Sequence, residues 1–423
     1  MKTKNNLDRR SFLKKGAFAA AAFTIVPRHV LGGSGYIAPS DELTKAIIGC
    51  GGICNGNHLR REGRLVALCD VDRQRLDSTL VKVDSSVKAY HDFRELLQQS
   101  DIDIVHIATP PHWHGIMSKM AAEAGKDIWC EKPMTRTIGE GKRVVEAVQR
   151  TGRMFRLNTW FRFRDPFYGL GTTVEPLKKL IDSGVLEWPL TFTVSGITGY
   201  NWKFYWKGEY NLQPMPVPEQ LDYDFWLGPA PYKPYNPERV HSKFRGYWDY
   251  DGGGLADMGQ HYLDPVQYML GKDDTSPVRI DIDAPQQHFD AVGTWRRIEY
   301  TYADGCKIIL DGENRDKNAA YIEGPSGKVF RNFESTIPNV KKLVASLPDP
   351  ESRITSFHES VRTRKKFALN EENGHRSCTV VNLGVIALRL GRTLHFDPVS
   401  QEFINDDVAN DLINQPMRGP WQI

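Results

Sequence analysis

A glycine-rich turn after a short apolar run constrains the fold of this 423-residue chain more than any other feature. Ala46-Ile47-Ile48 is typical of a buried strand, and Gly49-Cys50-Gly51-Gly52-Ile53 follows it directly. Glycines at this spacing permit a tight turn and let the backbone approach a pyrophosphate at the start of a helix. We therefore expect Gly49, Gly51, Gly52 and Ile53 to bind the phosphates of a dinucleotide.

A carboxylate at the end of the next strand supports this interpretation. The apolar run Leu65 to Cys69 ends in Asp70, about 20 residues after Gly49, where a carboxylate reaches the adenosine ribose. Asp70 favours NAD, while Arg73 nearby leaves NADP as the less favoured cofactor. The third small residue of the pattern is replaced by Cys54, so the turn alone is equally compatible with a structural loop.

Short apolar runs alternate with helical stretches from about residue 40 to residue 165, which predicts a doubly wound parallel sheet, a Rossmann domain. Thr137 and Glu140 form a possible capping box for the second long helix. The expected strands after the first are Leu65 to Cys69, Val87 to Tyr90, Ile104 to Ala108, Ile128 to Cys130 and Met154 to Asn158, and the helices are His114 to Ala124 and Ile138 to Arg150.

The pattern changes from residue 166 and predicts an α+β domain with an open, mainly antiparallel sheet over residues 166–375. A Trp-, Tyr- and Pro-rich excursion from Tyr200 to Tyr250 is long enough to shape a pocket. A carboxy-terminal helix, Thr379 to Leu390, and a polar tail fill residues 376–423. The expected strands are Leu190 to Ser195, Val278 to Ile282, Trp295 to Tyr302, Cys306 to Leu310, Ala320 to Glu323 and Lys328 to Phe330.

The charge composition and one amino-terminal motif indicate which binding partners and which cellular compartment to expect. With 55 basic and 52 acidic residues and no long run of like charges, the chain does not suggest nucleic-acid binding. Arg9-Arg10-Ser11-Phe12 before an apolar run of about 11 residues resembles a twin-arginine signal, and the run is too short for a span of roughly 20. We therefore expect residues 1–33 to be an export signal and the protein to be periplasmic or exported, with its cysteines as reduced core thiols.

Two further motifs follow predicted parallel strands, at the edge where such sheets bind ligands. The first motif supplies Thr109, Pro110, His112 and His114, and the second supplies Glu131 and Lys132. The two histidines have no third ligand nearby, so we expect no metal site and assign them cofactor-lining or capping roles. A lysine beside a cofactor can bond the reacting hydroxyl group, although this segment taken alone would favour an exposed Lys132 paired with Glu131.

A glycine turn at residues 252–254 opens a helix that carries Asp257 and His261 on one face. The spacing i, i+4 lets the carboxylate orient the imidazole for proton transfer, the alternative being a helix-surface pair without function. Aromatic rings between Trp160 and Tyr268 can pack against the CH faces of a sugar or simply form core. Candidate substrate contacts are Lys132, Trp160, Arg162, Tyr247, Asp257 and His261.

Together, the Gly49 turn, Asp70, Glu131-Lys132-Pro133 and Asp257-Met258-Gly259-Gln260-His261 resemble the glucose-fructose oxidoreductase, inositol dehydrogenase and MocA (Gfo/Idh/MocA) family. The resemblance implies a Rossmann domain, a second domain whose open sheet forms homo-oligomers, and a carboxy-terminal helix that returns to the first domain. It also implies that Lys132, Asp257 and His261 are catalytic.

The function expected is an exported NAD-dependent dehydrogenase of sugars or glycosides. His261 would accept the proton of the substrate hydroxyl group, Asp257 would orient the His261 imidazole, and Lys132 would polarise the hydroxyl group. Export also predicts a tightly held NAD, because the cofactor must be loaded beforehand. Two alternatives stay open: an NAD-dependent glycosidase that acts by transient oxidation and elimination, and a non-catalytic sugar-binding relative.

Overall fold

The computed structural model describes residues 42–54, 56–159, 162, 171–195, 206–313 and 318–423. Thr44–Ile423 form one compact unit. The expected export signal at residues 1–33 and the candidate Trp160 lie outside the described residues.

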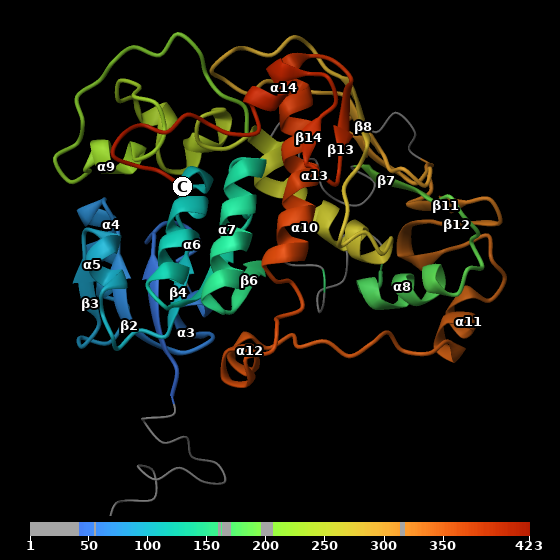
Figure 1. The fold of residues 1–423 in the computed structure, drawn as a ribbon, viewed down its shortest axis with the longest axis horizontal. Helices are drawn as coiled ribbons and strands as arrows, with labels where there is room; N and C mark the ends of the chain where they lie inside the picture. The colour runs from blue at the N-terminus through green and yellow to red at the C-terminus, as the bar shows by residue number, and fades with distance from the viewer. Residues whose placement is uncertain (1–41, 55, 160–161, 163–170, 196–205, 314–317) are drawn as a thin grey trace, which may run out of the picture. The chain divides into compact units, whose positions relative to one another are not determined.

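The amino-terminal part of this unit is a sheet with helices such as α6 and α7 beside it (Figure 1). Its six parallel strands have the order β3-β2-β1-β4-β5-β6, which is the Rossmann order. The predicted parallel sheet is confirmed, and all six expected strands are present. The strands are β1 (Thr44–Ile48), β2 (Arg64–Cys69), β3 (Lys88–Tyr90), β4 (Ile104–Ile107), β5 (Asp127–Glu131) and β6 (Phe155–Asn158). The helices are α3 (Asn57–Arg60), α4 (Arg73–Leu80), α5 (Phe93–Leu97), α6 (His114–Glu123) and α7 (Ile138–Thr151).

Local sequence signals set the ends of α7. Thr137 Oγ1 accepts a hydrogen bond from the Glu140 amide at 3.2 Å, and Gly152 ends the helix at φ 64°. The Glu140 carboxylate, however, accepts from the Arg136 amide at 3.0 Å rather than from Thr137. Only one of the two hydrogen bonds of the expected capping box is therefore formed.

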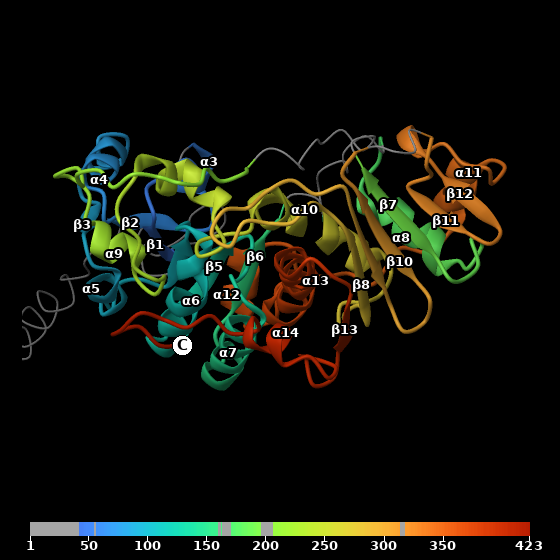
Figure 2. The same ribbon diagram turned by 90° about the horizontal axis from the view of Figure 1, so that it is seen from above.

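The carboxy-terminal part contains an eight-stranded mixed sheet, which lies beside α10 (Gly253–Met269) and α13 (Glu371–Leu390) (Figure 2). β7 and β10 run parallel and the other neighbours run antiparallel, so the predicted mainly antiparallel sheet is confirmed. In sheet order the strands are β12 (Gly327–Val329), β11 (Ile322–Gly324), β7 (Thr191–Ser195), β10 (Lys307–Asp311), β9 (Arg297–Thr301), β8 (Arg279–Asp283), β13 (Leu394–Asp397) and β14 (Glu402–Phe403).

Helix α13 joins the two parts because it contacts both α7 and α10. Every residue of α10 is buried, which fixes the position of the side chains it sends towards the Rossmann sheet. The remaining helices are α8 (Val174–Asp182), α9 (Tyr223–Leu227), α11 (Val340–Ser346), α12 (Phe357–Thr363) and α14 (Asp407–Asp411).

The carboxy-terminal region differs from the sequence-based expectation in two places. The tail supplies β13 and β14, and Leu394 pairs with Ile280 of the second sheet. The chain also returns to the Rossmann edge before residue 376, since the Leu157 amide donates to Leu369 O at 3.0 Å. Both pairings join residues far apart in the sequence, and local patterns do not predict them.

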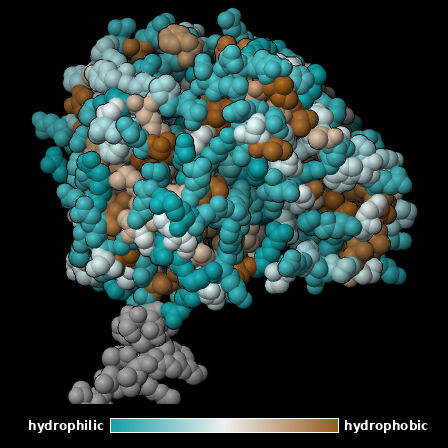
Figure 3. Space-filling view, viewed as in Figure 1, coloured by the Kyte–Doolittle hydropathy of each residue, from teal (hydrophilic) through white to brown (hydrophobic). Residues whose placement is uncertain are grey.

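The outer face of the eight-stranded sheet carries charged side chains. Arg279 pairs with Asp281, and Glu299 pairs with both Arg297 and Lys307. On the side of the molecule seen in Figure 3, hydrophilic side chains predominate and apolar ones are scattered between them. None of the described helices has the length and apolar character needed to cross a membrane. The homo-oligomer expected through this sheet stays a prediction.

Candidate active site

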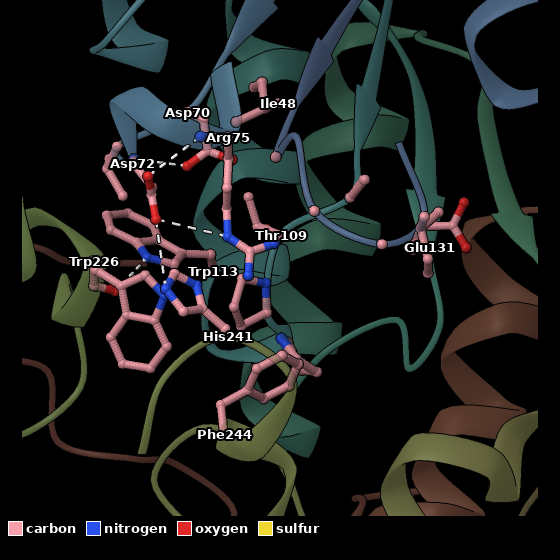
Figure 4. A pocket seen from close by; sticks show the side chains of 18 of the residues that line it. Ile48, Asp70, Asp72, Arg75, Thr109, Trp113, Glu131, Trp226, His241 and Phe244 are labelled. Carbon is pink, nitrogen blue, oxygen red and sulfur yellow. Dashed lines mark hydrogen bonds and ion pairs between the residues drawn. The ribbon is translucent and has the colours of Figure 1, made fainter. Parts of the chain in front are cut away.

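A cavity of about 490 Å³ lies at the carboxyl ends of β1, β2, β4 and β5, the edge at which the sequence places the ligand (Figure 4). Both parts of the chain line it. From the Rossmann part come Gly49, Gly51, Gly52, Ile53, Asp70, Asp72, Arg75, Thr109, Pro110, Trp113, Glu131 and Lys132, and from the second part come Phe225, Trp226, His241, Ser242, Phe244, Arg245, Asp251 and Asp257.

The glycine turn fits a dinucleotide phosphate. Gly49 has φ +98°, and a Cβ there would lie 2.7 Å from Ala108 O, so the turn requires glycine. A Cβ on Gly52 would meet nothing within 4 Å, which leaves room for a ligand close to the backbone. Cys54, the departure from the usual pattern, is fully buried and packs with Ile47 and Leu68. Its small side chain therefore serves the packing role of that position.

Asp70 lines the cavity and holds two loops together. Its Oδ2 accepts from the Cys50 amide at 2.6 Å and its Oδ1 from the Asp72 amide at 2.8 Å. Burial is the largest influence on this carboxyl group and raises its pKa. Beside it, Arg75 and His241 both reach Asp72, at 3.7 Å and 3.4 Å, as Figure 4 shows. This group of charges comes from both parts of the chain.

Thr109 and Pro110, two of the predicted cofactor contacts, line the cavity. His112 and His114 lie outside its lining. His112 Nε2 donates to Trp226 O at 3.0 Å, and burial lowers the pKa of His112 to about 3. The His114 ring lies between Thr109 O and Pro133 O, at 2.8 and 2.7 Å. Both histidines thus contact backbone carbonyl oxygens of neighbouring segments, and the cofactor-lining or capping role expected from the sequence stays a prediction.

Glu131 reaches the lining from the end of β5, well away from the Asp72 group in Figure 4. Its Oε1 accepts from His106 Nε2 at 2.8 Å, and Asn158 Nδ2 lies 3.0 Å from both oxygens. Burial lowers the pKa of His106 to about 4. Glu131 is therefore held by neighbours and does not pair with Lys132 as a surface ion pair would.

Lys132 contacts Asp257, although 125 residues separate them in the sequence. Lys132 Nζ donates to the Asp257 backbone oxygen and, at 3.0 Å, to Oδ1. Arg245 Nε donates to the same Oδ1 at 2.7 Å, and Trp206 Nε1 donates to Oδ2 at 2.9 Å. Burial opposes ionisation of Asp257, but Lys132 and Arg245 together hold its pKa well below the usual range. Asp257 is an anion that fixes the position of the lysine.

His261 lies one helical turn after Asp257, is 1% exposed and is outside the cavity lining. Burial, followed by the charge of Lys132, holds its pKa well below the usual range, so the imidazole is neutral. The neighbouring Gln260 anchors this turn, because its Oε1 accepts from the Met134 amide and its Nε2 donates to Gly374 O, both at 2.9 Å. The helix is thereby tied to the loop that carries Lys132.

The predicted substrate contacts Arg162 and Tyr247 do not line the cavity. Arg162 is buried and forms double hydrogen bonds with Asp264 and with Asp273. Tyr247 is also buried, and its hydroxyl donates to Glu209 O at 3.1 Å. Both side chains are thus engaged by neighbouring residues, and their assignment as substrate contacts stays a prediction. Trp160 lies outside the described residues.

Several lining residues were missed by the sequence analysis, although the aromatic excursion indicated a pocket. Phe225, Trp226 and Phe244 come from that excursion. Asp251 directly precedes the glycine turn of α10, and Arg245 lies six residues earlier; no motif marks either residue.

The excursion also covers the end of β2. The Arg73 amide donates to Gln220 O at 2.9 Å and the Asp222 amide to Val71 O at 3.0 Å. The Asp222 carboxylate accepts from His91 at 2.9 Å. The second part of the chain therefore closes over the Asp70 side of the cavity.

An aromatic cluster stabilises the wall nearby. The Trp421 ring lies edge-on to Trp113, with centroids 4.7 Å apart, and stacks on Phe225 at 5.7 Å. Trp113 Nε1 donates to Trp226 O at 3.0 Å. The wall thus combines three segments that are distant in the sequence.

The described residues contain no group of three or more His, Cys, Asp or Glu side chains arranged to hold a metal ion. All six cysteines are buried. The structure brings two groups of residues together. The glycine turn with Asp70 fits a dinucleotide, and Lys132 with Asp257 fits a hydroxyl-bearing substrate.

Comparison with known proteins agrees with this arrangement. Inositol 2-dehydrogenase of Salmonella paratyphi B is 32% identical over 154 residues, which are 35% of this chain and 44% of that protein. Glycosyl hydrolase family 109 protein 2 of a Shewanella species is 36% identical over 176 residues, or 35% of this chain and 38% of that protein. The chain thus spans less than half the length of these curated relatives.

Fold comparison gives broader coverage. The crystal structure of the WlbA dehydrogenase from Bordetella pertussis in complex with NADH and UDP-GlcNAcA covers 84% of this chain and 99% of that chain, with a TM-score of 0.56 and 16% identity. Residues 43–159 match the NAD-binding Rossmann fold of an oxidoreductase family, and residues 170–423 match the C-terminal alpha/beta domain of the same family. The chain therefore belongs to the Gfo/Idh/MocA oxidoreductase family.

Proposed function

We propose that this protein transfers hydride between a ring carbon of a sugar or glycoside and a tightly held NAD. The observation that carries the proposal is one continuous cavity whose lining includes the glycine turn, Asp70, Lys132 and Asp257. Dinucleotide-binding and hydroxyl-binding groups thus share one space.

The contacts of Lys132 suggest its role. Asp257 holds the lysine in place, and the remaining Nζ hydrogen-bonding capacity can be directed at the oxygen of a substrate hydroxyl group. The cofactor, when bound, supplies the hydride acceptor. The sequence predicts His261 as the proton acceptor, but His261 lies outside the lining, so the group that takes the proton directly must be another residue of the cavity wall.

The cover over the cavity supports retention of the cofactor. Two backbone hydrogen bonds and the His91–Asp222 contact hold the excursion over the Asp70 side, an arrangement that favours slow release of a dinucleotide. Asp70 makes NAD the proposed cofactor rather than NADP. Retention also agrees with the proposed export of the protein to the periplasm, for which residues 1–33 would be the twin-arginine signal. A soluble nicotinamide pool is lacking in that compartment.

The proposal is tested by denaturing the purified protein, identifying any released nicotinamide, and then screening sugars and glycosides by nicotinamide absorbance. Lys132→Met should retain NAD and lose about 10²- to 10⁴-fold in kcat, while Lys88→Met on the exposed edge strand should match the wild type. Absence of both released nicotinamide and binding of added NAD contradicts the proposal.

A glycosidase that oxidises its substrate transiently is a second candidate, favoured by the similarity to the glycosyl hydrolase family 109 protein. Asp257-Met258-Gly259 departs from the Tyr-Pro-Thr-like lead into the histidine expected of such enzymes. Release of p-nitrophenol from aryl glycosides without net NADH formation would identify this activity. Calorimetric sugar binding without hydride exchange would instead identify a non-catalytic binding protein.

A further inference from the structure

Asp251 differs from the other acidic side chains of the cavity. Asp70, Glu131 and Asp257 each accept at least two hydrogen bonds, and Asp72 caps α4. Asp251 is 2% exposed, and neither of its oxygens accepts a hydrogen bond from any residue that the structure describes. A buried carboxyl group without partners is costly unless it is protonated or binds a ligand.

The backbone fixes the position of Asp251 in the cavity wall. Its amide donates to Tyr247 O at 2.9 Å, and the glycine turn that follows opens α10. A Cβ on Gly253 would lie 2.5 Å from Val292, so the turn cannot shift easily. The same lining contains Lys132 and Asp257, which places Asp251 with the groups proposed to meet the reacting hydroxyl.

The charges around Asp251 come from three segments of the chain. Asp257 lies on α10, Arg245 on the 3₁₀ segment His241–Gly246, and Lys132 and Arg136 on the loop after β5. Burial and then Asp257 raise the pKa of Asp251 to about 8, and the three cations oppose this rise. Glu140 and Asp249 are the acidic groups near Arg136. Two neighbouring carboxyl groups with pKa values displaced in opposite directions are typical of an acid–base site.

We propose that Asp251 exchanges the proton of the reacting hydroxyl group, which rests on the proposed hydride-transfer function. In the oxidation direction the C–H bond gives hydride to the nicotinamide ring, and the O–H bond gives its proton to the Asp251 carboxylate as the C=O bond forms. In the reduction direction, the hydride returns to the substrate carbon and the proton returns from Asp251 to the substrate oxygen. Asp257 is held by three donors and His261 lies outside the lining, whereas Asp251 belongs to the lining and its two buried oxygens accept no hydrogen bond from the described residues.

The test compares Asp251→Asn, Asp251→Glu and His261→Asn with the control Asp249→Asn, all as NAD-loaded full chains. For the wild type, kcat for substrate oxidation should rise with pH and level off above about 8, since the base must be ionised. Asp251→Asn should lose about 10²- to 10⁴-fold in kcat and this pH dependence. Asp251→Glu should regain part of the rate together with the rise, and Asp249→Asn should retain both.

A second measurement does not depend on turnover. Infrared difference spectra of wild type against Asp251→Asn should show a protonated carboxyl band that disappears as pH rises through about 8. The proposal is overturned if Asp251→Asn keeps the wild-type rate and pH profile, if His261→Asn alone removes the rise, or if no such band titrates. Failure of the wild type to reduce any bound nicotinamide, with the band present, refutes hydride transfer and the proton step, but leaves the protonated Asp251 established.

Discussion

Two aspartates six residues apart in this site have pKa values displaced in opposite directions because their neighbours differ. Asp257 accepts hydrogen bonds from Lys132, Arg245 and Trp206, whereas Asp251 accepts none from the described residues. Burial is common to both, so the contrast comes from the partners. Residue identity alone therefore does not specify chemistry at this scale.

The stability of Asp251→Asn should reveal this difference. The folded pKa of Asp251, about 8, lies above the unfolded value of about 3.9, so the folded state binds the extra proton. The free energy of unfolding of the wild type consequently falls as pH rises between these values. Asparagine does not titrate, and the variant should gain ~1–3 kcal/mol relative to wild type near pH 8.

Denaturant unfolding of both proteins from about pH 5 to about pH 8 measures this gain. Asp249→Asn, which lies outside the cavity lining, serves as the control. A stability difference that does not change with pH contradicts the raised pKa.

The glycine turn offers a matched pair of substitutions. Gly49→Ala should lower the free energy of unfolding by about 1–3 kcal/mol, because φ +98° and the carbonyl of Ala108 both oppose a side chain. Gly52→Ala should change stability by less than about 0.5 kcal/mol but weaken NAD binding, since its Cβ enters open space in the lining. Denaturation of the nucleotide-free proteins and NAD titration separate the two effects, and the reverse ranking would contradict this account.

At the scale of elements, α10 is the centre of the site. It carries Asp257, follows Asp251 directly and is tied to the Lys132 loop by Gln260. Its later turn is fixed by Arg162, whose guanidinium bonds Asp264 and Asp273. Sequence motifs show the start of this helix, while its anchors come from distant residues.

Arg162→Met should destabilise the protein without changing KM. Removing the cation leaves the buried Asp264 uncompensated, at a cost of about 3–5 kcal/mol. Burial already raises the pKa of Asp264, and loss of Arg162 raises it further, so the folded variant binds a proton that the unfolded chain releases. Its deficit should therefore be larger near pH 8 than near pH 5.

Chemical denaturation at both pH values and steady-state kinetics test this expectation. Arg279→Met, which breaks an exposed pair on the outer sheet face, should cost less than about 1 kcal/mol. An increase in KM with unchanged stability would support Arg162 as a substrate contact.

The sequence predicts those elements whose signals are local. Continuous apolar runs such as Ile104 to Ala108 predict buried parallel strands, and the glycine turn and Asp70 predict the nucleotide edge. β13 was missed because its four residues gain their partner, β8, only in the folded chain. Asp251 was missed as a site residue because its character depends on burial and on Lys132, Arg245 and Asp257, which no local pattern reports.

At the scale of the whole molecule, the cavity belongs to both family domains. The excursion of the second part bonds to the end of β2, and α13 packs on α7 and α10. The proposed retention of NAD therefore rests on the contacts between the two parts, rather than on the glycine turn alone.

Asp222→Ala should speed NAD release. Asp222 accepts from His91 at 2.9 Å and caps α9 through the Phe225 amide at 3.0 Å, so its loss loosens the cover. We expect an increase in the dissociation rate of about tenfold, equivalent to about 1.4 kcal/mol. Displacement of bound NAD by labelled NAD measures the rate, with Asp77→Ala on the exposed side of α4 as control. Equal rates in all three proteins would contradict the role of the cover.

The position of Trp421 has a consequence for biosynthesis. Its ring packs on Trp113 and Phe225, which lie in the cavity wall. A nascent chain on the ribosome has made the nucleotide turn and the first wall long before residue 421 leaves the exit tunnel. Under the proposed function, firm capture of the dinucleotide must then wait until residue 421 has left the ribosome and packed on this wall.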